Sequence, residues 1–360
     1  MITLVLGTRP EIIKLSPLIR ECERKHIPFS ILHTGQHYSY EMDRIFFEEL
    51  ELPKPGFSLD VGSGLHGEQT GKILAGAERV LNEQRPDIIL VQGDTNTVLA
   101  GALAAVKLYI PVGHVEAGLR SFDRKMPEEI NRIIADHVGE YLFAPTETAA
   151  GYLHREGISE KKIFVTGNTV VDAVKENLII AQKNAKILDQ LGLREKEFIL
   201  VTAHRAENVD VRERLDGILQ GLSSVHEESG MPVLFPVHPR TEKMMKEFGI
   251  RAPEISMIQP LGYLEFLLLE SKSALLLTDS GGIQEEGCVL RVPCVTLREN
   301  TERPETLEVG SNVLAGTDPG IILKSALDMI DRDRSWNNPF GDGNAASRIV
   351  DIIADKGLIQ

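Results

Sequence analysis

Short apolar runs alternate with longer helical patterns along the first half of the chain. Helices are predicted from about Glu11 to Arg24, near Glu41 to Glu51, and after Thr97. Continuous runs of Val, Ile and Leu are typical of strands that are covered on both faces. Their alternation with helices predicts right-handed βαβ units and a parallel sheet. The runs are ITLVLG (2–7), FSILHTG (29–35), DIILVQGD (87–94), IPVGHVEAG (110–118), YLFAPTE (141–147) and KIFVTGN (162–168).

A second series of the same kind begins near residue 198, after a polar helical stretch from Asn177 to Lys196. Two such series predict an α/β protein with two Rossmann-like, doubly wound domains, residues 1–168 and 169–344. Residues 345–360 follow as an amphipathic helix. The strands of the second series are expected in FILVTAH (198–204), PVLFPVH (232–238), ISMIQP (255–260), ALLLTDS (274–280) and PCVTLRE (293–299).

Composition and charge restrict the class of protein. The 360 residues carry a formal net charge of −14, which disfavours nucleic acid and anionic membranes as partners because both attract a basic surface. No apolar run reaches the roughly 20 residues that span a bilayer, and MITLVLGTRP lacks the features of a signal peptide. The three cysteines have neither metal nor redox spacing. A soluble cytoplasmic protein is expected.

Polar residues stand directly after many of the apolar runs. In a parallel sheet these positions are the carboxyl ends of strands, where ligands of open α/β folds bind. Because both series share this feature, the sequence predicts two rims that face one cleft. The residues are Thr8, Arg9, Gln36, His37, Asp94, Glu116, His204, His238, Asp279 and Ser280.

The segment TDSGGIQEE passes from a strand end into a predicted helix. Ser280, Gly281 and Gly282 would place unhindered backbone N–H groups at the helix N-terminus, which suits a phosphate. Glu286 could accept hydrogen bonds from ribose hydroxyls. The alternative is a capped helix whose glycines only form the turn. The chain has no P-loop lysine motif, so ATP binding is disfavoured.

Cations gather at two other strand ends. Arg9 and Lys14 lie near a helix start, where the helix macrodipole disfavours positive charge. A bound anion would offset this repulsion. The alternative is that both are solvated surface charges. His204 and Arg205 follow a strand, where a phosphate contact is expected. His238 is interpreted as structural.

A set of acids belongs to the first half: Asp94, Glu116, Glu128 and Glu129. A metal site would need tighter spacing of ligands, whereas crowded carboxyl groups can serve as general acids and bases. Taken alone, Glu128 and Glu129 are also explained as acids at a helix start after Pro127.

The chain carries a series of ordered motifs from Gly7 to Gly343: GTRPEIIK, QGDTNTVLA, GHVEAGLRS, PEEINR, PTE, VTGNTVVDA, VTAHR, PVHP, LTDSGGIQEE, NTERPE and FGDG. Together they resemble the non-hydrolysing UDP-N-acetylglucosamine 2-epimerases over nearly the whole chain. The resemblance implies a glycosyltransferase-B-like fold with a deep interdomain cleft and a C-terminal helix that returns to the first domain. It also implies a homodimer, no metal or redox cofactor, and epimerisation at C2 by elimination and re-addition of UDP.

The same resemblance assigns residues. Asp94, Glu116 and Glu128 match catalytic acids, with Asp94 and Glu128 expected to transfer protons, and His204 matches a catalytic histidine. Gln36, His37 and Gln69 match part of an allosteric UDP-N-acetylglucosamine site, although Glu68 stands where that site has an arginine. Matches to substrate contacts are Arg9, Lys14, Arg132, Leu261, Phe266, Ser280, Gly281, Gly282, Glu286 and Arg303.

Four alternatives to this function stay open at the level of sequence. A paralogue acting on a UDP-diacetamido-uronic acid would need an extra cation for the C6 carboxylate. A hydrolysing epimerase would release free sugar, and a glycosyltransferase of the same fold would need an acceptor surface. A non-catalytic nucleotide-sugar sensor would not need the acids together with His204. The predicted partner is thus a UDP-sugar, with surface polysaccharide biosynthesis as the pathway.

Overall fold

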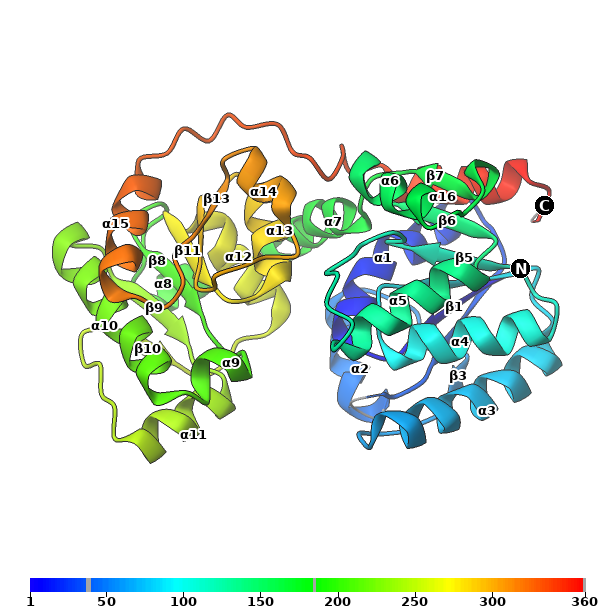
Figure 1. Cartoon of the computed structure of the whole chain (residues 1–360), viewed down its shortest axis with the longest axis horizontal. Helices are drawn as coiled ribbons and strands as arrows, with labels where there is room; N and C mark the ends of the chain where they lie inside the picture. Colours follow the sequence, from blue (N-terminus) through cyan, green and yellow to red (C-terminus); the bar gives the residue numbers. More distant parts are fainter. Residues whose placement is uncertain (37–39, 184–185, 359–360) are drawn as a thin grey trace. The chain divides into compact units, whose positions relative to one another are not determined.

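The computed structural model describes residues 1–36, 40–183 and 186–358 and divides into two compact units. Unit 1 comprises residues 1–176 and 340–360, and unit 2 comprises residues 177–339. Each unit contains a parallel β-sheet with helices packed against it (Figure 1). Unit 1 is coloured blue to green, with its C-terminal segment red, and unit 2 is coloured green to orange. The predicted class, two Rossmann-like doubly wound sheets, is confirmed.

Unit 1 holds a seven-stranded sheet in the order β3-β2-β1-β4-β5-β6-β7, with parallel pairing throughout. The chain order reverses between β1 and β4, which makes their carboxyl ends the switch point where doubly wound folds bind ligands. The strands are β1 (Ile2–Leu6), β2 (Phe29–His33), β3 (Phe57–Ser58), β4 (Ile88–Gln92), β5 (Val112–Val115), β6 (Tyr141–Ala144) and β7 (Ile163–Val165).

Helices α3 and α4 lie side by side in unit 1 (Figure 1) and bury alanine and leucine side chains against Val5, Ile89 and Val91 of the sheet. The other helices of the unit connect or flank the strands. The helices are α1 (Arg9–Arg24), α2 (Tyr40–Glu49), α3 (His66–Gln84), α4 (Asn96–Lys107), α5 (Pro127–Val138), α6 (Glu147–Arg155), the 3₁₀ helix η1 (Glu160–Lys162) and α16 (Ala345–Asp355).

Unit 2 repeats this topology with six parallel strands in the order β10-β9-β8-β11-β12-β13. Its switch point lies between β8 and β11. The strands are β8 (Ile199–Thr202), β9 (Val233–Pro236), β10 (Ser256–Ile258), β11 (Leu275–Thr278), β12 (Cys294–Thr296) and β13 (Asn312–Leu314); the helices are α8 (Ile187–Leu191), α9 (Ala206–Val209), α10 (Arg212–Ser229), α11 (Pro239–Phe248), α12 (Tyr263–Lys272), α13 (Gly281–Leu290), α14 (Pro304–Glu308) and α15 (Pro319–Ile330).

Helix α7 (Thr169–Lys183) begins in unit 1 and ends in unit 2. Its Asp172 carboxylate accepts the backbone N–H groups of Ala345 and Ala346, at 3.3 and 3.0 Å, and so caps α16. The apolar face of α16 is buried in unit 1, where this helix packs beside α1 (Figure 1). The first turns of α7 therefore belong structurally to unit 1, whereas the sequence placed the boundary at residue 168.

Among the helices in the described part of the chain, none combines the length and the apolar character that crossing a bilayer would require.

Candidate functional site

Glu116 is the most firmly held of the candidate acids. It directly follows β5, adopts a left-handed backbone conformation with a φ of 70°, and is 6 % exposed. Its two carboxylate oxygens accept hydrogen bonds from Lys14 Nζ at 2.8 and 2.9 Å, and Gln92 Nε2 also donates to it. Lys14 comes from α1, so the cation predicted from GTRPEIIK and the predicted acid form one ion pair. This pairing holds the Glu116 carboxylate in one place.

Asp94 follows β4 at the switch point and is paired with Arg132 of α5. Arg132 Nη2 and Nε lie 2.6 and 3.2 Å from Asp94 Oδ2. The same guanidinium contacts Glu129 at 2.5 Å, and Glu129 also accepts the backbone N–H groups of Ser121 and Phe122. The Asp94 side chain is 34 % exposed, so it is oriented by Arg132 while one edge stays accessible.

Glu128 differs from both of these acids. It lies in the first turn of α5, directly after Pro127, and is half-buried. In the described ranges it has no hydrogen bond or ion pair with another side chain. A carboxyl group without a fixed partner can gain and lose a proton without breaking an internal contact, which suits general acid–base chemistry.

Glu11 is a buried acid that the sequence did not single out as a functional residue. It is 2 % exposed and accepts hydrogen bonds from Gly7 N at 2.7 Å, Thr8 N at 2.8 Å and Thr95 Oγ1 at 2.5 Å. It thus ties the loop before α1 to the loop that carries Asp94. Burial raises the pKa of Glu11 to about 7 and outweighs its hydrogen bonds, which act to lower this pKa.

This raised pKa predicts a pH-dependent stability. The folded protein binds the Glu11 proton more tightly than the unfolded chain, so the contribution is complete below pH 4.5 and is lost as the pH rises through about 7. The shift corresponds to about 3 kcal/mol. We expect Glu11→Gln to flatten this part of the dependence, because the amide can keep the network. Denaturant titrations between pH 4.5 and 8 measure it. The exposed Glu68→Gln is the control, and an unchanged slope in Glu11→Gln would contradict the assignment.

The remaining candidates of unit 1 are engaged within it. Arg9 Nε lies 3.1 Å from Asp43 Oδ1. The Gln36 amide oxygen accepts from Thr97 N and Oγ1, both at 2.8 Å, while Gln69 Nε2 donates to the backbone oxygen of Gln36 at 2.8 Å. The structure thus brings Gln36 and Gln69 together as a buried crosslink. His37, the third member of that predicted set, lies outside the described residues.

His204 follows β8 and is oriented by Asp279, which follows β11. His204 Nδ1 lies 3.1 Å from Asp279 Oδ1, and the backbone N–H groups of His204 and Arg205 each donate to Asp279 Oδ2 at 2.9 Å. Burial opposes ionisation of Asp279, but the hydrogen bonds and charge of His204 lower the pKa of this carboxyl. The imidazole is 43 % exposed, so its other nitrogen can meet a ligand. The sequence predicted Asp279 at a strand end but not its role in orienting His204.

The N-terminus of α13 has the properties expected of a phosphate site. Ser280 is the N-cap, Gly281 and Gly282 open the helix, and the first turn has no acidic residue. A Cβ atom built on Gly281 or Gly282 would meet only Glu302 Oε2 or Ser280 Oγ, each at 3.8 Å. Neither glycine is therefore required by packing within the chain. The open space lies where helix N–H groups and the macrodipole attract an anion.

A pocket of about 270 Å³ borders this helix start. It lies at the carboxyl ends of β8, β9 and β11, and its lining is mixed apolar and polar. His238, interpreted from sequence as structural, caps α11, and its ring lies 5.9 Å from that of His204. The lining residues are Thr202, Ala203, His204, Pro236, His238, Pro260, Leu261, Phe266, Ser280 and Ile283.

Glu286 and Arg303 are the last two predicted contacts in unit 2. Glu286 lies in α13 and is 8 % exposed. Arg303 is the N-cap of α14, and its Nε lies 2.7 Å from Glu285 Oε1, which precedes Glu286 in α13. Both residues are thus anchored to the helix whose N-terminus is the candidate phosphate site.

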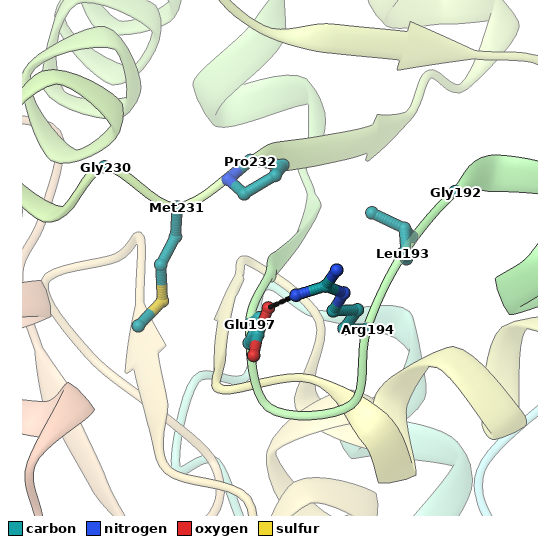
Figure 2. Close-up of a pocket in the computed structure, with 7 residues that line it drawn as sticks. All are labelled: Gly192, Leu193, Arg194, Glu197, Gly230, Met231 and Pro232. Carbon is teal, nitrogen blue, oxygen red and sulfur yellow. Dashed lines mark ion pairs between the residues drawn. The ribbon is translucent and has the colours of Figure 1, made fainter.

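A second pocket, of about 480 Å³, does not carry a site (Figure 2). Its lining segments 192–197 and 230–232 precede β8 and β9, so it lies at the amino ends of the strands. Figure 2 shows its two charged side chains, Arg194 and Glu197, joined as an ion pair. Their charged atoms are 3.8 Å apart, and both side chains are largely exposed. Ligands of this sheet topology bind at the opposite edge.

Within residues 1–36, 40–183 and 186–358, no group of three His, Cys, Asp or Glu side chains is placed to hold a metal ion.

The chain is similar to known proteins along nearly its full length. A model of the family described as UDP-N-acetylglucosamine 2-epimerase matches residues 20–354. The UDP-N-acetylglucosamine 2-epimerase of Methanocaldococcus jannaschii is 55% identical over 359 residues, covering 98% of each chain. The UDP-2,3-diacetamido-2,3-dideoxy-D-glucuronate 2-epimerase of Pseudomonas aeruginosa is 42% identical over 355 residues, covering 97% of this chain and 98% of the relative.

Solved structures give the same result. The crystal structure of the M. jannaschii UDP-GlcNAc 2-epimerase in complex with UDP-GlcNAc and UDP has a TM-score of 0.89 at 55% identity, covering 98% of this chain and 99% of that chain. The wall teichoic acid polymerase TagF has a TM-score of 0.56 at 12% identity, covering 99% of this chain and 89% of that chain. At this identity the likeness shows a shared fold alone.

Proposed function

This chain belongs to the UDP-N-acetylglucosamine 2-epimerase family, and on that premise we propose that it interconverts UDP-N-acetylglucosamine and UDP-N-acetylmannosamine without net hydrolysis. A base removes the C2 proton while the C1–O bond breaks and UDP leaves, giving 2-acetamidoglucal. UDP then adds back at C1 as a proton reaches the opposite face of C2. The observation that supports this most directly is the pairing of two chemistries: oriented acids in unit 1 and a phosphate-type seat in unit 2.

Unit 2 supplies UDP binding in this proposal. The backbone N–H groups at Ser280, Gly281 and Gly282 receive the diphosphate, and His204, oriented by Asp279, stabilises the charge that grows on it as the C1–O bond breaks. The uracil and ribose then occupy the pocket beside Leu261 and Phe266. Glu286 accepts hydrogen bonds from the ribose hydroxyls, and Arg303 adds positive charge.

Unit 1 supplies proton transfer. Asp94 and Glu128 act at C2, one for each face, because Asp94 keeps an accessible edge and Glu128 has no fixed partner in the described residues. Glu116 is held by Lys14, which suits a positioning role. Arg132 orients Asp94, and Arg9 contributes positive charge at the start of α1.

The resemblance also carries proposals on assembly and setting. We infer a cytoplasmic homodimer that serves polysaccharide biosynthesis and needs no added cofactor. Substrate activation through Gln36 and Gln69 would require their internal hydrogen bonds to open. Light scattering of the purified chain would measure the assembly, and rate curves in UDP-N-acetylglucosamine would reveal activation as sigmoidal dependence.

Gly281→Ala is expected to separate ligand binding from folding. The added methyl group has no close contact in the chain, so the free energy of unfolding should change by less than about 0.5 kcal/mol. The same methyl group would stand where the diphosphate approaches, so UDP affinity should fall at least about tenfold, about 1.4 kcal/mol. Calorimetry with UDP measures the loss. Gly151→Ala in α6, also with open space around it, is the control; equal affinities in all three proteins would contradict the phosphate seat.

Proton NMR with UDP-N-acetylglucosamine in heavy water tests the whole proposal. We expect UDP-N-acetylmannosamine to appear with deuterium at C2, and no free sugar to accumulate. Free N-acetylmannosamine would indicate a hydrolysing enzyme instead. Turnover of a UDP-diacetamido-uronic acid in preference to UDP-N-acetylglucosamine would assign the chain to the paralogous reaction.

A further inference from the structure

Glu270 is a buried carboxyl group that meets no hydrogen-bond donor. It lies in the last turn of α12, its residue has no exposed surface, and neither carboxylate oxygen has a partner in the described part of the chain. The neighbouring core of α12 and β11 is apolar, including Leu268, Leu269 and Leu276. An ionised carboxylate here would lose its hydration without replacement. The neutral acid is therefore the form that fits this position.

A second carboxyl group lies beside it. Glu286 of α13 is within hydrogen-bonding reach, and burial followed by the charge of Glu286 raises the pKa of Glu270 well above its usual range. Two carboxyl groups in contact hold one proton between them. Other ionisable groups lie on α12, α13 and the elements around them. Burial raises the pKa of two thiols, Cys288 of α13 and Cys294 of β12. Glu285 of α13 is paired with Arg303, and Lys272 of α12 with Glu195. The remaining groups are Tyr263 and Glu265 of α12 and the exposed Asp189 of α8.

The order of burial gives the two acids different roles. Glu270 is fully buried, whereas Glu286 is 8 % exposed, so Glu286 is the one that a ligand can reach. Glu270 also stands at the carboxyl end of α12, where the helix macrodipole disfavours a negative charge. The proton therefore belongs on Glu270, which leaves Glu286 as the ionised acceptor.

We propose that Glu270 is a positioning residue for nucleotide binding. It keeps one proton and donates a hydrogen bond to the Glu286 carboxylate, so that the remaining lone pairs of Glu286 are aimed at the ribose hydroxyls. This proposal rests on the proposed function, because that function assigns Glu286 to the ribose. Without the donated hydrogen bond, the Glu286 carboxylate would rotate or take up a proton itself.

Two variants of the full chain test this proposal. Glu270→Gln keeps a donor of nearly the same shape, and Glu270→Met removes it. Affinities are measured by calorimetry for UDP and for 2′,3′-dideoxy-UDP, which lacks the ribose hydroxyls. We expect Glu270→Gln to bind UDP within about twofold of the unaltered chain and Glu270→Met to bind roughly tenfold more weakly, while the dideoxy compound binds all three proteins equally. Effects should fall on KM and leave kcat nearly unchanged.

Each other outcome decides against the proposal. If Glu270→Met loses affinity equally for UDP and for 2′,3′-dideoxy-UDP, the role of Glu270 is merely structural. If Glu270→Met binds UDP as tightly as the unaltered chain, Glu270 has no role in nucleotide binding. A Glu270→Gln protein as weak as Glu270→Met would exclude donation. If the unaltered chain binds no UDP, the proposed function fails instead. The proton on Glu270 is then still testable without ligand. Thermal stability of the unaltered chain should fall as the pH rises above 4.5, and Glu270→Gln should show a smaller fall, because only the contribution of Glu11 remains.

Discussion

An Asp94→Asn enzyme should lose roughly 100- to 10,000-fold in kcat, because general acid–base catalysis typically contributes that much. The amide keeps the size of the side chain and an oxygen for Arg132, which lies 2.6 Å from the carboxylate, but it cannot accept a proton. If Asp94 and Glu128 serve opposite faces of C2, deuterium exchange from one epimer should be lost in Asp94→Asn, and exchange from the other should be lost in Glu128→Gln. Proton NMR in heavy water, started from each epimer, measures both rates.

Nucleotide binding provides the matched measurement for these two variants. The diphosphate is proposed to bind unit 2, so UDP affinity should change by less than about threefold, which is well under 1.4 kcal/mol. Glu140→Gln, at an exposed ion pair with Lys162, should keep full activity. An Asp94→Asn protein that exchanges deuterium at C2 as fast as the unaltered enzyme would remove Asp94 from proton transfer.

Asp136→Asn should destabilise unit 1 by about 3–5 kcal/mol, the range for breaking a buried ion pair. Asp136 is 1 % exposed and lies 2.7 Å from His114 Nδ1 and 2.7 Å from Arg120 Nη1. Burial lowers the pKa of His114, but the charge of Asp136 outweighs this and raises it. Removing the carboxylate charge leaves the buried Arg120 guanidinium and His114 with a weaker shared acceptor.

Denaturant unfolding of unit 1 measures this loss, and Asp342→Asn is the control. Asp342 forms an ion pair with Arg348 at 2.6 Å, but both side chains are about half exposed. Such surface pairs contribute about 0–1 kcal/mol. A similar small loss for Asp136→Asn would mean that the buried network adds little to the stability of unit 1.

Most of the fold could be predicted because its strands are buried on both faces. Runs such as residues 88–91 and 275–277 are continuously apolar and lie within β4 and β11. The edge strands β3 and β13 were not predicted, since two or three half-covered residues give no periodic signal. The start of α7 at Thr169 was also missed, because its apolar first turn reads as a continuation of the preceding strand.

The strand-end positions of the candidate site residues could be predicted from the sequence, whereas their hydrogen-bond and ion-pair partners could not. Strand-end residues such as Asp94 and His204 follow from the general behaviour of parallel sheets. The contact of Lys14 with Glu116 joins residues 102 positions apart, and no local pattern contains that information. The same holds for Glu11 and Glu270, whose unusual properties come from burial that tertiary packing creates.

The discontinuity of unit 1 also affects how the chain can fold during synthesis on the ribosome. Helix α16 covers α1, yet it is translated only after all of unit 2. Unit 2 is continuous and can complete its core before α16, which packs against α1, has been made. The nascent amino-terminal half is therefore exposed to chaperones and to wrong partners for longer than the half that is made after it.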